Sequence, residues 1–207
     1  MRIDEIILAS QSPRRKELLL QLGLEFQVIP ATGEEVIRGS SPEEVVMNLA
    51  EMKAMEVAER VLLEGTSAKE NRLIIGADTV VVNEGIILGK PSSSEEAAQM
   101  LGSLSGKVHS VYTGVCFVMI NDHHAMIADR FAEETKVHVY PMNEQDIAEY
   151  IQTGEAMDKA GAYGIQGRFA RHVGPIEGEY NTVVGLPIGR LWQGIRAIEN
   201  NCNGKGE

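Results

Sequence analysis

The amino-acid sequence predicts a single α/β domain built around a mixed β-sheet. Strand-like apolar segments alternate irregularly with helix-like segments, which favours this fold class, and neither an internal repeat nor a low-complexity linker divides the chain. Its 207 residues, 43% of them hydrophobic, suffice for one sizeable core with two lobes around a cleft. We therefore expect one domain over residues 1–207, with a disordered tail from about residue 200.

The residues that typically begin and end a helix are most easily recognised near the N-terminus. Residues 3–9 form a predicted strand, and Ser12 can cap a helix that has Pro13 at its first position and Gly23 at its exit. Residues 26–30 form a second, short predicted strand.

Further elements are predicted from capping boxes and from apolar runs. They comprise a helix from the Ser41–Glu44 capping box to about Glu64, a buried strand over 73–82, a helix from the Ser93–Glu96 capping box to about Leu101, strands over 108–120 and 127–140 joined by a polar turn at 121–124, a helix from Asn143 to near Gly154, glycine-rich loops over 155–185, and a last helix after Pro187.

Composition excludes several classes of protein. The formal net charge of -11 argues against a nucleic-acid binder, which needs a basic surface, but not against a phosphorylated substrate held by a few focused cations. No apolar run approaches the roughly 20 residues of a membrane span. The N-terminus lacks the features of a secretory signal, and two cysteines, Cys116 and Cys202, fit a reducing compartment. We expect a cytoplasmic protein without membrane or nucleic-acid partners.

A candidate phosphate site lies where the first strand ends and the first helix begins. Free amides and the positive end of the helix dipole favour an anion there. The hydroxyls of Ser10 and Ser12 and the guanidiniums of Arg14 and Arg15 add suitable donors. The alternative is an ordinary capped helix with solvated arginines.

Two charged residues stand in otherwise apolar segments. Asp78 lies within the predicted strand 73–82, where an unpaired carboxylate is costly unless it serves a metal, a cation or proton transfer; backbone amides at a strand edge could also hold it. Lys53 lies in the apolar stripe of its helix, so its ammonium either extends outward into water or points at an anion.

Three weaker signals lie in loops. Lys90 occupies a tight turn between Gly89 and Pro91, and a solvated turn without a binding role is the alternative. Glu35 could give an oxygen ligand to a hard divalent cation, although acids in such loops are usually solvated. In the glycine-rich segment 158–167, the amide of Gln166 offers a donor beside an acceptor, which complements the imide edge of uracil or thymine; an ordinary surface loop is the alternative.

Together and in this order, these segments resemble the Maf family of nucleoside triphosphate pyrophosphatases. The resemblance spans nearly the whole chain and is carried by residues 9–15, 49–54, 76–81, 89–91, 104–109 and 158–167. It implies a Maf/Ham1 inosine triphosphatase-like fold, with a mixed, strongly twisted, elongated sheet flanked by helices and two lobes around a central cleft.

The resemblance also implies a role for each candidate residue. Asp78 matches the family's essential acid, described as the proton acceptor, and we assign it to the metal together with Glu35. Lys53 and Lys90 complete the catalytic set. The substrate-binding set comprises Ser10, Ser12, Arg14, Arg15, Thr79 and Gln166. Within it, Arg14, Thr79 and Gln166 match the specificity positions of the subgroup acting on dTTP and UTP, not those of the 7-methyl-GTP subgroup.

The implied reaction is hydrolysis of a nucleoside triphosphate to the monophosphate and pyrophosphate, assisted by Mg²⁺ or Mn²⁺, in a homodimer. Two alternatives stay open at this point. The first is a nucleotide-binding regulator of cell division and septum formation, and the second is a pyrophosphatase for modified nucleotides in general.

Overall fold

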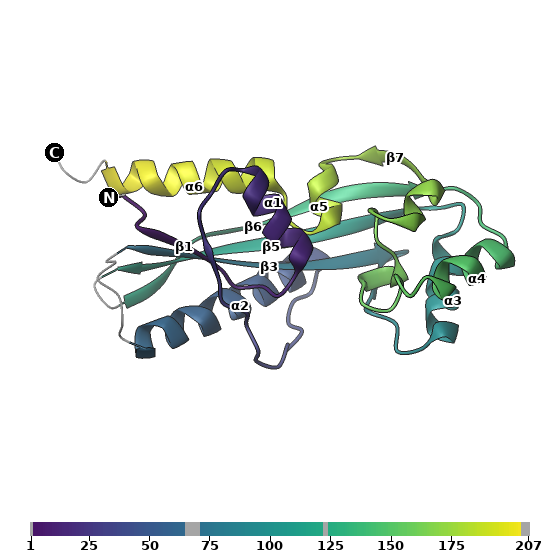
Figure 1. The fold of residues 1–207 in the computed structure, drawn as a ribbon, viewed down its shortest axis with the longest axis horizontal. Helices are drawn as coiled ribbons and strands as arrows, with labels where there is room; N and C mark the ends of the chain where they lie inside the picture. The colour runs from purple at the N-terminus through teal and green to yellow at the C-terminus, as the bar shows by residue number, and fades with distance from the viewer. Residues whose placement is uncertain (1, 65–70, 122–123, 204–207) are drawn as a thin grey trace. The chain divides into compact units, whose positions relative to one another are not determined.

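A computed structural model describes residues 2–64, 71–121 and 124–203 (Figure 1). Within them, the strands β1 and β3 run parallel, whereas β3 and β4 run antiparallel, so the predicted mixed sheet is confirmed. The strands are β1 (Glu5–Leu8), β2 (Gln27–Val28), β3 (Arg72–Asn83), β4 (Ile86–Leu88), β5 (Val108–Asn121), β6 (His124–Val139) and β7 (Val173–Glu177). Their order in the 7-stranded sheet is β2-β1-β3-β5-β6-β7, with β4 paired to β3.

Helices connect and cover these strands, as the α/β prediction requires. The helices are α1 (Pro13–Gln21), α2 (Pro42–Glu64), α3 (Ser94–Leu104), α4 (Glu144–Gln152), α5 (Tyr180–Val184) and α6 (Ile188–Asn203), with 3-10 helices η1 (Ala160–Ala162) and η2 (Arg168–His172). Among the described residues, no helix has both the length and the apolar character that crossing a membrane requires.

The chain forms two compact units. Unit 1 comprises residues 1–78, 113–132 and 185–207, and unit 2 comprises residues 79–112 and 133–184. The division falls inside β3, β5 and β6, so each of these long strands contributes to both units.

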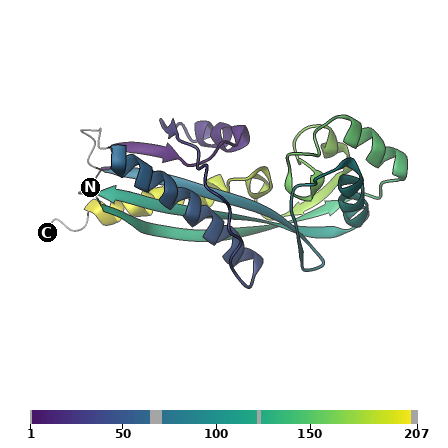
Figure 2. The same cartoon turned by 90° about the horizontal axis from the view of Figure 1, so that it is seen from below.

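In unit 1, α2 and α6 cover opposite faces of the sheet (Figures 1 and 2). The backbone of α2 lies directly on β3 and β5, because a Cβ added at Gly76 or Gly114 would come within 2.2 or 2.3 Å of an α2 carbonyl oxygen. On the other face, Gly194 of α6 packs against the ring of Phe117 in β5. These contacts bury the continuous apolar run of β3, as its sequence predicts.

In unit 2, α3 packs against α4 and against η1. Ser93 caps α3 through its hydroxyl, which accepts a hydrogen bond from the amide of Glu96 at 3.2 Å. The carboxylate of Glu96 reaches Ser92 instead of Ser93, because Ser92 offers both its amide and its hydroxyl. The predicted capping box is therefore half right, and Ser41, Glu44 and Ser40 repeat the same pattern at the start of α2.

The segment 155–185 differs most from the expected glycine-rich loops. It contains η1, η2, β7 and α5. Strand β7 forms because its backbone pairs with β6, where Val137 faces Ile176, and Pro175 is tolerated because β7 lies at the edge of the sheet. These are tertiary contacts that local composition does not encode. Residues 122–123 of the predicted turn and residues 204–207 of the predicted tail lie outside the described residues, and α6 continues to Asn203.

Candidate active site

The first wall of the candidate site is the start of α1. Ser12 caps the helix, its hydroxyl lying 3.5 Å from the amide of Arg15, and Pro13 takes the first helical position as predicted. The hydroxyl of Ser10 accepts hydrogen bonds from the Ser12 amide at 3.2 Å and from Arg15 Nη1 at 3.1 Å. Arg15 also donates through Nε to the carbonyl of Gly185 at 2.8 Å, so its guanidinium is fixed between two segments of the chain.

The electrostatics of Arg15 connect this helix start to the predicted acids. Burial lowers the pKa of Arg15, Asp78 raises it, Arg14 lowers it and Glu35 raises it, in that order of size. Arg15 therefore interacts electrostatically with Arg14, Asp78 and Glu35, all of which belong to unit 1.

The centre of the site is an ammonium between two carboxylates. Lys53 Nζ lies 2.5 Å from Asp78 Oδ1 and 2.8 Å from Glu35 Oε1. The Lys53 and Asp78 side chains are 17% and 12% exposed, whereas Glu35 is 57% exposed. Lys53 thus points at anions and does not extend outward, and the cation that Asp78 requires within its buried strand is Lys53.

Glu56, which was not among the predicted site residues, holds the loop that carries Glu35. Its carboxylate accepts hydrogen bonds from the Thr32 amide at 2.8 Å, the Thr32 hydroxyl at 3.2 Å and the Gly33 amide at 3.0 Å. These bonds, the Thr32 amide foremost, lower the pKa of Glu56. Glu56 follows Lys53 by one helical turn, so its position on the same face of α2 was the available signal.

The donor set suits a hard divalent cation. Mg²⁺ in proteins is commonly held by one or two carboxylates plus phosphate oxygens of the substrate, and Glu35 and Asp78 provide two carboxylates that meet at one ammonium. Across residues 2–64, 71–121 and 124–203, no group of three or more His, Cys, Asp or Glu side chains is placed to hold a metal ion.

The remaining predicted site residues, Thr79, Lys90 and Gln166, belong to unit 2. Thr79 follows Asp78 in β3, and Lys90 and Gln166 are both exposed. A backbone hydrogen bond of 3.0 Å from Gly161 to the carbonyl of Gly89 ties the Lys90 turn to the glycine-rich segment. Within this unit, the structure therefore joins the two segments that carry Lys90 and Gln166.

Comparison with known proteins shows how the chain is related. The profile of a family described as Maf-like protein matches residues 5–198. The chain belongs to the Maf family. It is 53% identical to a dTTP/UTP pyrophosphatase of Agathobacter rectalis over 95% of this chain and 98% of that protein. It is 46% identical to one of Lachnoclostridium phytofermentans, over 93% and 94%, and 48% identical to one of a Thermoanaerobacter species, over 91% and 93%.

Among solved structures, a HAM1 protein from Coxiella burnetii aligns with a TM-score of 0.36 and 17% identity, over 65% of this chain and 72% of that one. A likeness this weak adds nothing to the fold described above.

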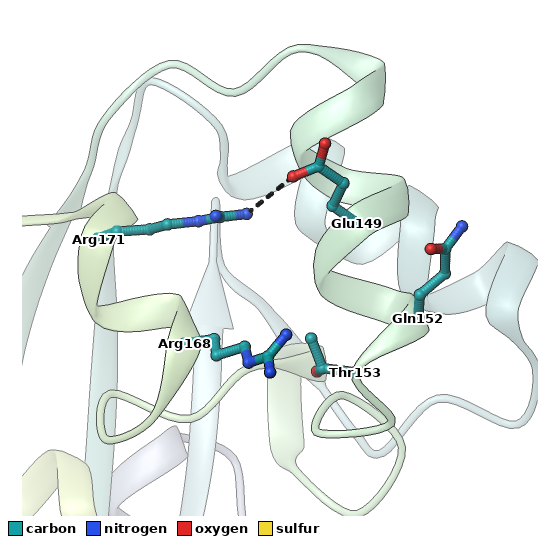
Figure 3. A pocket seen from close by; sticks show the side chains of 5 residues that line it. All are labelled: Glu149, Gln152, Thr153, Arg168 and Arg171. Atoms are coloured by element: carbon teal, nitrogen blue, oxygen red, sulfur yellow. Dashed lines mark hydrogen bonds and ion pairs between the residues drawn. The ribbon is translucent and has the colours of Figure 1, made fainter.

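This Maf protein also has a pocket that includes none of the predicted site residues. The pocket has a volume of about 320 Å³, lies in unit 2 and is lined by Glu149, Gln152, Thr153, Arg168 and Arg171 (Figure 3). Arg171 Nη2 lies 3.5 Å from the Glu149 carboxylate, which offsets part of the positive charge. The candidate active site is therefore defined by its side chains and not by this pocket.

Proposed function

We propose that this Maf protein is a nucleoside triphosphate pyrophosphatase that hydrolyses dTTP and UTP to the monophosphate and pyrophosphate. The observation that carries the proposal is the partly buried Lys53 ammonium held by Asp78 and Glu35. Relatives up to 53% identical over nearly the full chain are named dTTP/UTP pyrophosphatases, and this chain has Arg14, Thr79 and Gln166 at the positions that the resemblance ties to those substrates.

In the proposed reaction, the oxygen of a water molecule attacks the α-phosphorus and forms a new P–O bond. The bond from the α-phosphorus to the bridging oxygen breaks, and pyrophosphate leaves with that electron pair. Asp78 accepts the proton that the water loses. Such a transfer depends on positioning and on charge neutralisation more than on covalent chemistry.

The chain's cations neutralise the triphosphate. Lys53 lies 2.5 Å from the proton acceptor, so a phosphate oxygen bound beside Asp78 is within reach of the same ammonium. The start of α1 offers amides and the Arg14 guanidinium to phosphate oxygens, and Lys90 adds a further positive charge. Arg15 keeps this helix start in place through Ser10 and Gly185.

A divalent cation, Mg²⁺ or Mn²⁺, belongs to the proposal. Glu35 and Asp78 would hold it, because their oxygens are the hard ligands that such ions prefer. When bound, the ion polarises the α-phosphate and the attacking water. Glu56 would position Glu35 for the ion, because its hydrogen bonds fix the loop from which Glu35 extends.

Pyrophosphate release from purified protein tests the proposal. The substrates are dTTP, UTP, the other canonical nucleotides, modified pyrimidine nucleotides and 7-methyl-GTP, each with and without Mg²⁺ or Mn²⁺. We expect metal-dependent release with dTTP and UTP foremost. A preference for modified nucleotides would favour a broader pyrophosphatase, and light scattering on the active fractions tests the homodimer.

Asp78→Asn separates the enzyme from a nucleotide-binding regulator of septum formation. The substitution preserves the shape of the side chain and removes the proton acceptor, so we expect kcat for dTTP to fall by at least about 100-fold. Binding of a non-hydrolysable dTTP analogue, measured by calorimetry, checks that the site stays intact. Near wild-type turnover would show that Asp78 has been assigned wrongly.

A further inference from the structure

A buried histidine on the sheet contacts the segment that carries Gln166. His109 lies in β5 and is 3% exposed, and Tyr163, three residues before Gln166, is 5% exposed. A hydrogen bond of 2.7 Å joins His109 Nε2 to Tyr163 Oη, and the two rings meet edge to face at 5.3 Å. This contact links residues 54 positions apart.

The second ring nitrogen of His109 makes this residue unfavourable in an apolar core. Its Nδ1 is buried and has no hydrogen-bond partner among the described residues, which costs stability. Burial lowers the pKa of His109 to about 4 and raises the pKa of Tyr163. At neutral pH both groups are uncharged, so the hydrogen bond joins a neutral imidazole to a neutral phenol.

Tyr163 is held by more than His109. Its ring packs against Phe169 at 4.6 Å, and Phe169 packs against Tyr150 at 5.0 Å. The hydroxyl of Tyr150 accepts a hydrogen bond from the amide of Gly164 at 3.3 Å. The backbone is therefore anchored at two consecutive residues shortly before Gln166.

The chain is anchored again just after Gln166. Gly167 has a φ of 85°, and a Cβ there would lie 2.6 Å from the Glu155 carboxylate. The same carboxylate accepts a hydrogen bond from the amide of Arg168 at 3.1 Å. The exposed side chain of Gln166 thus extends from a backbone that is fixed on both sides, and the anchor supplied by the sheet is His109.

We infer that His109 is a positioning residue for base recognition, whose hydrogen bond to Tyr163 holds the 163–168 segment so that Gln166 presents its amide to the pyrimidine. The inference rests on the proposed function. It differs from a purely structural role for His109, because it requires that breaking one buried hydrogen bond changes the choice of nucleotide while the fold persists.

Steady-state pyrophosphate release by four variants of the whole protein tests this inference, with dTTP and dCTP as substrates and thermal unfolding as a check of folding. Tyr163→Phe removes only the hydroxyl, and His109→Leu removes the ring nitrogens. His109→Gln places an amide within reach of Tyr163. Arg168→Ala, a change of an exposed side chain in the same segment, is the matched control.

We expect Tyr163→Phe and His109→Leu to lower the ratio of kcat/KM for dTTP to that for dCTP by about fivefold, the effect of losing one hydrogen bond. The loss falls on KM for dTTP, with kcat within about twofold. His109→Gln restores most of the ratio, and Arg168→Ala leaves it unchanged. Tyr163→Phe suffices for the test if His109→Leu does not fold.

A folded Tyr163→Phe variant with the wild-type ratio, or one that loses activity equally on both nucleotides, overturns the inference. The wild-type protein separates this failure from that of the proposed function. If wild type releases no pyrophosphate, both proposals fail; if wild type prefers dTTP and the variants do so equally, only the role of His109 fails.

Discussion

At the scale of single residues, the candidate site of this Maf protein has charged groups at positions where apolar ones would be expected. Asp78 lies in the continuous apolar run of β3 and Lys53 lies in the apolar stripe of α2, and the two side chains form an ion pair at 2.5 Å. A buried ion pair gives little net stability, because the desolvation of both charges offsets their attraction. Its presence here is therefore better explained by the reaction than by folding.

The depressed pKa of His109 predicts a pH dependence of stability. The folded protein resists protonation of this ring down to a pKa of about 4, whereas the unfolded chain takes up the proton near pH 6.5. Stability from this residue is thus full above pH 6.5 and is lost as the pH falls toward 4, by up to about 3 kcal/mol.

Urea unfolding at pH 7 and pH 5 measures this effect. Between these two values we expect wild type to lose about 2 kcal/mol more than His109→Gln does, since the other titrating groups are common to both proteins. An equal loss in the two proteins would show that the ring is not kept neutral by burial.

At the scale of elements, α2 positions the charged side chains of the candidate site in unit 1. One helix presents Lys53 to Asp78 and Glu35 and, one turn later, presents Glu56 to the backbone of Thr32 and Gly33. Its other contacts, to the glycines of β3 and β5, set its distance from the sheet. A helix that approached less closely could not bring its lysine to a strand carboxylate.

Glu56→Ala should impair catalysis without contacting substrate. It removes an acceptor of three hydrogen bonds from Thr32 and Gly33, so the loop that carries Glu35 loosens, and we expect kcat/KM to fall about tenfold with a higher requirement for metal. Metal titrations of dTTP turnover measure both effects. Glu56→Gln, which keeps an acceptor oxygen, should recover part of the activity, and Glu59→Ala on the exposed side of α2 should behave as wild type.

Glycine-to-alanine substitution should have opposite effects at Gly76, where β3 contacts α2, and at Gly102 in α3. Gly76→Ala places a Cβ 2.2 Å from the Ala50 carbonyl, so the helix must move, at a cost of about 3 kcal/mol or more. Gly102→Ala in α3 meets nothing within 4 Å and should stabilise the protein by about 0.5–1 kcal/mol. Thermal and urea unfolding compare the two, and equal behaviour would contradict the close packing.

At the scale of the whole molecule, a chain with a net charge of -11 has to bind a polyanion. The field of such a surface repels a triphosphate, so we propose that binding relies on cations concentrated at the site and on a divalent ion. The cations of unit 1 are partly neutralised by Asp78 and Glu35. A metal that takes over these carboxylates would leave Lys53 available to phosphate.

Binding of nucleotide should therefore stabilise the protein only together with metal. With a non-hydrolysable dTTP analogue at about 100 times its Kd, linkage adds about 2.7 kcal/mol, which for a chain of this size raises Tm by about 5–10 °C. Differential scanning calorimetry with analogue alone, Mg²⁺ alone and both together measures this. An equal shift without metal would argue against the part given to Glu35 and Asp78.

Elements with local signals could be predicted from the sequence alone. The cap at Ser12 with Pro13, the continuous apolar run of β3 and the helix after Ser41 appear where they were predicted, because caps and periodicity act within a few residues. The Maf resemblance supplied the candidate residues, and the structure brings Lys53, Asp78 and Glu35 into contact.

Features that depend on residues far apart in the sequence became evident in the folded structure. Strand β7 and the η1 and η2 helices formed where loops were expected, since β6 and the aromatic residues around Phe169 compensate for the glycines. Three further features depend on residues 23 to 54 positions apart. They are the contact of Lys53 with an anion instead of water, the hydrogen bonds of Glu56 to the Glu35 loop, and the contact of His109 with Tyr163. Local composition cannot encode such pairs, because what places them is the packing of helix and sheet.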